Sequence, residues 1–279
     1  MTYNCLFTVL TDPALVENTL ENAMAAAVAY DAHLDVLCLG VDRSQTGYYY
    51  AGASAIVLQE TITRAHEEAK EIEEQAKTIL GASTIRWGTE LGVSQLADLS
   101  RHVAARARFS DVVILPKPYG ESRGAELEAV TEATLFDGQT PAIILPENAA
   151  PVPSPGRVMI AWNESPEALS AVRAAMPLLR TATDVRVTVI APPTHGPDRS
   201  DPGGQLTQYL ARHNLRVEVD VLAKTLPRVS DVILRQVTDI NADMLIMGAY
   251  GHSRFREALF GGATRYMLEQ APVPVLMSR

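Results

Sequence analysis

The stretch that decides the fold is Gly248-Ala-Tyr-Gly251-His-Ser-Arg-Phe-Arg-Glu-Ala-Leu-Phe-Gly261-Gly262-Ala-Thr264, which directly follows the apolar run Met244-Leu-Ile-Met247. Glycine has no Cβ, so at a strand-to-helix junction the backbone can turn sharply and bring its N–H groups close to an anion. The spacing, G-x2-G-x9-G, differs from the P-loop and from the G-x-G-x-x-G dinucleotide fingerprint. It indicates a phosphate-binding turn of another type. The alternative is that these glycines only form a tight turn and allow close packing.

The chain contains two copies of one design, because similar segments recur at a constant offset. Tyr119-Gly-Glu-Ser-Arg123 parallels Tyr250-Gly-His-Ser-Arg254. Gln139-Thr-Pro-Ala-Ile-Ile-Leu145 parallels Gln270-Ala-Pro-Val-Pro-Val-Leu276 at the same offset. The matching order of these segments predicts that each copy is one domain with the same succession of strands and helices.

Each copy also opens in the same way, with an apolar run followed by a helix-capping residue and a proline. The pairs are Asp12-Pro13 and Ser165-Pro166, and both predict the start of a helix. Between the copies, residues 147–156 contain three prolines and small residues, as a short stiffened linker does. We therefore expect one domain at residues 1–148, a linker at 149–156 and a second domain at 157–279.

Within each copy, apolar runs alternate with helical patterns. Continuous apolarity is typical of strands that are covered on both faces, which favours a parallel sheet in an α/β fold. In the second copy, strands are expected at residues 158–162, 185–191, 217–223, 244–247 and 273–277. In the first copy, a long helix is expected with this core-facing stripe: Ile62, Ala65, Ala69, Ile72, Ala76 and Ile79.

Composition bounds the class of protein. The 279 residues, 47% hydrophobic and 20% charged, are those of a globular chain with about two domains. A net charge of −9 argues against binding to nucleic acid or to an acidic membrane surface, because both require a basic surface on the protein. No apolar run approaches the ~20 residues of a membrane span, and no basic segment precedes the first apolar run. We expect a cytoplasmic protein in which Cys5 and Cys38 are reduced and packed as small hydrophobes.

The glycine spacing and its surroundings resemble the nucleotide-binding signature of the universal stress protein family, in which G-x2-G-x9-G-[Ser/Thr] binds the ribose and phosphates of ATP. The resemblance covers the second half well and the first half in outline. It implies a tandem protein of two Rossmann-like, adenine nucleotide alpha hydrolase-like domains. Each is a three-layer α/β sandwich with a five-stranded parallel sheet of order 3-2-1-4-5. It also implies a role in stress response or signalling.

That strand order places a ligand crevice between the first and fourth strands, where the winding direction reverses. By the resemblance, Asn163 stands where the family has an Asp that contacts the nucleoside, and Ile190 where an aliphatic residue packs on adenine. The ligand is ATP or another adenine nucleotide, with or without Mg²⁺. The expected site comprises Ala161, Trp162, Asn163, Ile190, Met247, Gly248, Tyr250, Gly251, Gly261, Gly262, Ala263 and Thr264.

One position departs from the family pattern. Gly262 stands where ATP-binding members carry Ser or Thr, so a hydroxyl that would contact phosphate is absent. Whether Thr264 or backbone N–H groups compensate stays open, as does the preference for ATP over ADP or AMP.

The first copy lacks most of the motif and is expected to hold a degenerate site. Leu10 stands in the place of Asn163, and Lys117 in that of Gly248. Val130-Thr131 replaces the glycine pair 261–262, and a β-branched residue does not adopt the backbone conformations open to glycine. The alternative is a different anion site built on Lys117.

The motifs of an enzyme are missing. The six histidines include no H-x-x-x-H pair, neither cysteine lies in C-x-x-C, and Ser253 is not in a G-x-S-x-G elbow. Glu164 and Glu257 are the acids nearest the glycine stretch that phosphoryl transfer would need. We expect no enzyme and no metal site. Slow ATP hydrolysis and a nucleotide-independent interaction scaffold are the alternatives.

The resemblance also implies how the copies associate. In the family, domains pair through antiparallel contact of their last strands, here residues 142–145 and 273–276, which would form a pseudo-dimer within one chain. Assembly into homodimers stays open, and exposed strand edges favour it. The stress signal and the downstream partner are not encoded in any motif of the sequence.

Overall fold

The computed structural model describes residues 2–43, 55–120, 123–147, 149–151, 154–192, 201–249 and 262–279. Contacts divide the chain into two compact units, residues 3–140 and residues 141–279, the latter together with the first two residues. Each unit is an α/β structure.

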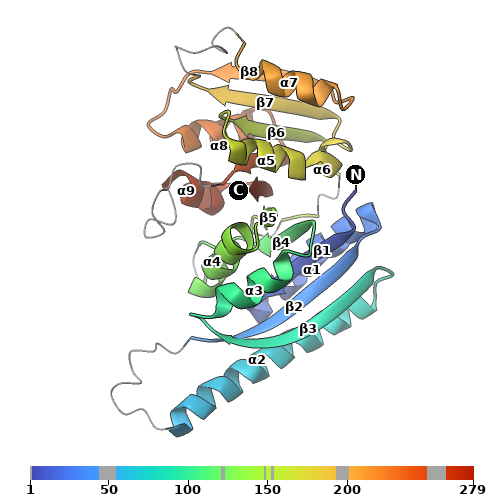
Figure 1. The fold of residues 1–279 in the computed structure, drawn as a ribbon, viewed down its shortest axis with the longest axis vertical. Helices are drawn as coiled ribbons and strands as arrows, with labels where there is room; N and C mark the ends of the chain where they lie inside the picture. Colours follow the sequence, from blue (N-terminus) through green and yellow to red (C-terminus); the bar gives the residue numbers. More distant parts are fainter. Residues whose placement is uncertain are drawn as a thin grey trace. The chain divides into compact units, whose positions relative to one another are not determined.

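The first unit contains a parallel sheet of order β3-β2-β1-β4, with helices on both faces (Figure 1). Its strands are β1 (Cys5–Leu10), β2 (His33–Asp42), β3 (Arg86–Gln95) and β4 (Val112–Pro116). Its helices are η1 (Pro13–Leu15), α1 (Val16–Tyr30), α2 (Ala55–Gly81), α3 (Leu99–Ala107), α4 (Ala125–Glu132) and η3 (Ala133–Asp137). Helices α1 and α2 pack on each other, and α3 packs on α4 and η3. Strands β1 and β4 are buried almost throughout, as central strands of a parallel sheet are.

Helix α2 confirms the predicted long helix, with one correction. The stripe from Ala65 to Ala76 is buried, but Ile62 is 42% exposed, so the prediction that Ile62 faces the core is wrong. The 27 residues of α2 span about 40 Å at 1.5 Å per residue. The ten residues of β2 span only about 33 Å. The helix is therefore longer than the sheet that it covers, and Ile62 lies in its amino-terminal part.

The second unit contains a six-stranded sheet of order β5-β10-β9-β6-β7-β8. Its strands are β5 (Ala142–Leu145), β6 (Arg157–Trp162), β7 (Asp184–Ile190), β8 (Val217–Leu222), β9 (Met244–Gly248) and β10 (Val275–Ser278). Its helices are α5 (Pro166–Ala174), α6 (Met176–Leu179), α7 (Gly204–Ala211), α8 (Val229–Asp239) and α9 (Gly262–Gln270). The order β8-β7-β6-β9-β10 confirms the predicted order 3-2-1-4-5 for the second copy.

Strand β5 is the antiparallel member of this sheet. Ile143 lies opposite Leu276, and Ile144 lies opposite Val275. This is the pairing that the resemblance implies for the last strands of the two copies. It also explains why the second compact unit begins at Pro141, ahead of the prolines of the predicted linker.

The two predicted helix caps are present. The side chain of Asp12 accepts a hydrogen bond from the backbone N of Ala14 at 2.9 Å, and Pro13 follows it. The Oγ of Ser165 accepts one from the backbone N of Ala168 at 3.1 Å, and Pro166 follows it. Each cap satisfies an N–H group that the first turn of a helix cannot pair.

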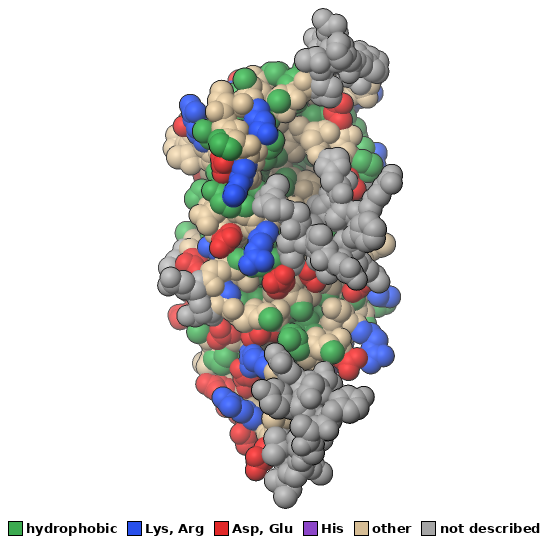
Figure 2. Space-filling view, turned by 90° about the vertical axis from the view of Figure 1, so that its left-hand side faces the viewer, with side chains coloured by type: hydrophobic (Ala, Val, Ile, Leu, Met, Phe, Trp, Pro, Cys, Tyr) green, Lys and Arg blue, Asp and Glu red, His purple; other side chains and the backbone are tan. Residues whose placement is uncertain are grey.

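Two further expectations concern the cysteines and the surface. Cys5 and Cys38 are free thiols, and burial raises the pKa of Cys38 to about 12, which keeps this thiol protonated and unreactive. None of the helices in the described ranges is both long and apolar enough to cross a bilayer. On the face of the described residues shown in Figure 2, acidic and basic side chains are intermingled.

Gly248, at the end of β9, lies against the first turn of α5. A Cβ built on Gly248 would lie 2.5 Å from the backbone N of Ala168 and 2.8 Å from the carbonyl carbon of Glu167. Backbone atoms of a helix cannot move aside as the end of a flexible side chain can. The strand end and the helix therefore approach as closely as they do only because residue 248 is a glycine.

Gly248→Ala should lower the free energy of unfolding by about 2 kcal/mol, because the added methyl group overpacks against backbone. Urea denaturation measures this, followed by Trp162 fluorescence in a Trp87→Phe background, where Trp162 is the one remaining tryptophan and lies in the second unit. The control is Gly81→Ala at the end of α2, where a Cβ would meet no atom within 4 Å and stability should not fall. Equal stability of Gly248→Ala and the parent would contradict the close contact.

Glu132, in α4, should make the protein less stable as the pH rises. Burial, with Glu128 and Asp137 nearby, raises the pKa of Glu132 to about 7. The native state thus keeps a proton that the unfolded chain releases near pH 4.5, and stability is lost as the pH rises to about 7. Glu132→Gln removes this loss. We expect a gain of about 1 kcal/mol at pH 8, because solvent screens a half-exposed carboxylate, and little change at pH 4.

Urea denaturation of the parent and of Glu132→Gln at both pH values measures this difference. Glu60→Gln, an exposed position on α2, is the control and should not alter the pH dependence. A gain in stability that is the same at pH 4 and pH 8 would show that the titration of Glu132 is not its cause.

Candidate functional site

The carboxyl ends of β6 and β9 lie side by side in the second unit. Ala161 is the register partner of Met247, so the last residues of the two strands, Trp162 and Gly248, lie at the same edge of the sheet. Strands β7 and β8 continue the sheet on one side of this pair, and β10 on the other. This is the point where the winding direction reverses, and such points hold the ligand sites of open α/β sheets.

Asn163 is the first residue after β6, and its side chain is exposed. Its Oδ1 accepts a hydrogen bond from the backbone N of Ser165 at 3.2 Å, and Ser165 in turn caps α5. The described part of the chain gives the amide nitrogen of Asn163 no partner. The Asn163 oxygen therefore shapes the turn, and its NH₂ group is left as a hydrogen-bond donor at the crevice.

Gly248 has a structural explanation in this arrangement. Its contact with the backbone of Glu167 and Ala168 brings the chain that leaves β9 directly over the first turn of α5. The sequence left two interpretations open for the glycines, a ligand cradle and close packing. At Gly248 the geometry supports close packing, which also brings the start of the glycine stretch next to the turn that holds Asn163.

The other predicted site residues lie at different distances from this point. Ile190 ends β7, two strands away from β9, and is followed by Ala191 with φ of 47°. Thr264 lies in α9 and is buried. Gly262 and Ala263 are described only as backbone in the first turn of α9. Tyr250, Gly251 and Gly261 lie outside the described residues, as do His252 and Glu257.

The structure therefore brings together five of the predicted residues, which are Ala161, Trp162, Asn163, Met247 and Gly248. Within the described ranges, no group of three or more His, Cys, Asp or Glu residues is placed to hold a metal ion. The arrangement can bind a polar ligand through side-chain and backbone N–H groups.

The corresponding end of the first unit is occupied by an ion-pair cluster. Arg43 follows β2, and its Nη2 lies 2.6 Å from Oε1 of Glu126, while its Nη1 lies 3.0 Å from Oε2 of Glu68. The same guanidinium reaches the carbonyl oxygen of Thr11, just after β1, at 3.5 Å. The hydrogen bond that the Arg43 guanidinium donates to Glu126 is the main cause that raises the pKa of Arg43, despite partial burial.

Glu126 is the buried member of this cluster and belongs to the first turn of α4, where the helix dipole favours a carboxylate. Its carboxylate lies against Gly124, where a Cβ would come within 2.4 Å of it. Sequence analysis missed Arg43, Glu68 and Glu126 because none of them belongs to the glycine pattern. No local signal identifies them, since the three come from a strand end and two separate helices.

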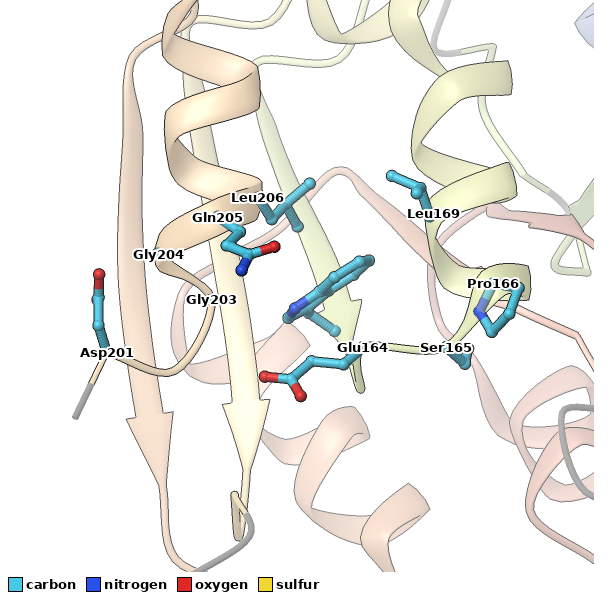
Figure 3. A pocket seen from close by; sticks show the side chains of 10 residues that line it. Glu164, Ser165, Pro166, Leu169, Asp201, Gly203, Gly204, Gln205 and Leu206 are labelled. Atoms are coloured by element: carbon cyan, nitrogen blue, oxygen red, sulfur yellow. The ribbon is translucent and has the colours of Figure 1, made fainter. Parts of the chain in front are cut away.

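A cavity of about 440 Å³ opens beside the β6–α5 turn (Figure 3). It is lined by Trp162, Glu164 and Leu169 on one side and by the start of α7 on the other. Sequence analysis placed Trp162 near a ligand but missed α7. The Pro202-Gly203-Gly204 turn that precedes α7 is the signal that was available.

Comparison with known proteins agrees with this geometry. Residues 155–279 match the model of the universal stress protein family. A universal stress protein of Synechocystis sp. is 33% identical over 76 residues, which is 27% of this chain and 25% of that protein. The match thus spans about a quarter of the curated relative.

Solved structures share the fold over nearly the whole chain. A universal stress protein from Archaeoglobus fulgidus has a TM-score of 0.72 at 14% identity, covering 99% of this chain and 96% of that one. A putative universal stress protein from Pseudomonas aeruginosa has a TM-score of 0.59 at 14% identity, covering 99% and 93%. Identities this low show the fold alone. The second half of the chain is thus similar to the universal stress protein family, and the whole chain shares the fold of these structures.

Proposed function

We propose that the second half binds one adenine nucleotide at the carboxyl ends of β6 and β9, and that the protein acts in the cytoplasm in stress response or signalling rather than as an enzyme. The observation that carries the proposal is the position of Asn163, exposed beside the strand end from which the glycine stretch begins. This placement sets a polar side chain at a topological switch point, where open α/β sheets bind ligands.

The chemistry of the described residues suits the parts of a nucleotide. The NH₂ group of Asn163 would donate to an acceptor on the base or ribose. Ile190 would supply an apolar surface for adenine, and α9, which begins at Gly262, would offer first-turn N–H groups to phosphate. Mg²⁺ would accompany a di- or triphosphate.

The proposal assigns nucleotide binding to the second half alone. In the first unit, the Arg43 guanidinium and two carboxylates fill the equivalent place. The carboxylates of Glu68 and Glu126 would repel phosphate, and displacing Arg43 would leave Glu126 buried without its counter-ion. The first half then serves as a structural partner.

One observation favours a second candidate function, a scaffold that binds partner proteins and no nucleotide. Gly248 is accounted for by its contact with α5, so this glycine is needed with or without a ligand. Nucleotide titration separates the two candidates.

Calorimetric titration with ATP, ADP and AMP, each with Mg²⁺, should give one site per chain. Asn163→Ala should weaken binding about tenfold, the equivalent of one hydrogen bond near 1.4 kcal/mol. Gly262→Ser restores the hydroxyl of the family pattern and should raise the ratio of ATP to AMP affinity. Ser154→Ala, an exposed position ahead of β6, is the control and should bind as the parent does. No heat with any adenine nucleotide, from folded and nucleotide-free protein, would contradict the proposal and leave the scaffold.

Glu126→Gln tests the cluster in the first unit. Loss of the buried carboxylate should lower the free energy of unfolding of this unit by about 2 kcal/mol. Glu68→Gln, at the more exposed partner, should cost only about 0.5 kcal/mol. Urea denaturation followed by Trp87 fluorescence, in a Trp162→Phe background, measures both. Equal effects of the two substitutions would contradict the central place of Glu126, and a second nucleotide site in Glu126→Gln would contradict the structural role of the first half.

A further inference from the structure

The cavity beside the β6–α5 turn shares Trp162 with the residues expected at the nucleotide site but extends away from the others. Its lining does not include Asn163, Ile190, Met247 or Gly248. Its volume, about 440 Å³, lies in the range of small-molecule pockets. A cavity of this size raises the question of which ligand it binds.

Strand geometry places the cavity on one face of the sheet. A Cβ on Gly203, at the start of α7, would contact the side chains of Val187 and Val189. Trp162 is the register partner of Val189, so both side chains point to this α7 face. Successive side chains of a strand point to opposite faces, so Ile190 points to the other face. The surface proposed for adenine and the cavity thus lie on opposite sides of β7.

The cavity walls are largely apolar. The indole of Trp162 lines it together with Leu169 and Pro166 of α5 and Leu206 of α7. Leu206 is buried, and Trp162 is half-buried. These side chains offer a flat aromatic surface and an aliphatic wall to a ligand of modest size.

Both charged residues among the described residues that line the cavity are acidic. They are Glu164 and Asp201, and this described lining contains no Lys, Arg or His. Figure 3 shows the Glu164 carboxylate extending between the amino-terminal ends of α5 and α7, with Asp201 at the outer side of α7. Glu164 has φ of 61°, a left-handed conformation that costs about 1 kcal/mol or more in a residue with a side chain. The fold thus holds a carboxylate at this mouth at a cost in backbone energy.

We propose that this cavity binds a small organic cation, with its apolar framework against Trp162, Leu169 and Leu206 and its ammonium group at Glu164. An ammonium ion is attracted both by a carboxylate and by the face of an indole, whereas an anion would meet Glu164 and Asp201, with no positive group among the described lining residues. This binding is distinct from that of the nucleotide and does not depend on it.

Three probes of nearly equal size separate charge from shape: 2-phenylethylamine is a cation, 2-phenylethanol is neutral and phenylacetate is an anion. Fluorescence of Trp162 in the Trp87→Phe background reports their binding without nucleotide. We expect saturable quenching by the amine, at least tenfold weaker affinity for the alcohol and no binding of phenylacetate. Glu164→Gln should lower the amine affinity to that of the alcohol and leave the alcohol unchanged.

Glu167→Gln is the matched control, an acid in the first turn of α5 that does not line the cavity, and it should bind the amine as the parent does. Equal affinity for amine and alcohol, an unchanged amine affinity in Glu164→Gln, or no saturable signal would each overturn the proposal. Because no nucleotide is present, these outcomes are independent of calorimetric titration with ATP, and either proposal can fail alone.

Discussion

The architecture of the second half depends on the contact between Gly248 and the first turn of α5. The backbone N of Ala168 would lie 2.5 Å from any Cβ at position 248, so strand and helix meet backbone to backbone. This contact joins the end of the fourth strand of the copy to the helix that follows its first strand. It thereby sets the turn that carries Asn163 beside the beginning of the glycine stretch. The close approach of strand and helix is therefore a consequence of one missing side chain.

The two units differ in the side chains that they carry at the carboxyl ends of their strands. In the first unit, Arg43 at the carboxyl end of β2 pairs with Glu126 and Glu68. A buried carboxylate is tolerated only when a counter-ion and hydrogen bonds offset its desolvation. In the second unit, the carboxyl ends of β6 and β9 carry an exposed amide, Asn163, and a glycine, Gly248.

In the second half, the two faces of β7 have different surroundings. Val189 and Ile190 are adjacent on β7, yet the period of two in a strand directs them to different layers. Trp162 shares the face of Val189, where the nearby charges are carboxylates. The surface proposed for adenine at Ile190 and the cavity proposed for a cation thus lie on opposite faces of β7.

The sequence by itself determined the strands, the helix caps and the order of the second sheet. Buried parallel strands must be apolar on both faces, and a cap needs only its own neighbours, so residues such as Ser165 and runs such as 244–247 carry local signals. The positions of Asn163 and Gly248 at the carboxyl ends of β6 and β9 were also predictable, because both residues lie at the ends of recognisable apolar runs.

Only the tertiary structure decided which distant groups meet. Arg43 and Glu126 are 83 residues apart, and no periodicity links a strand end to a helix in another layer. The sequence could not show that Gly248 contacts helix backbone, that Ile62 lies where α2 is longer than the sheet, or that Trp162 faces α7. Each depends on the distance between packed elements, which is set by the whole core and not by local sequence.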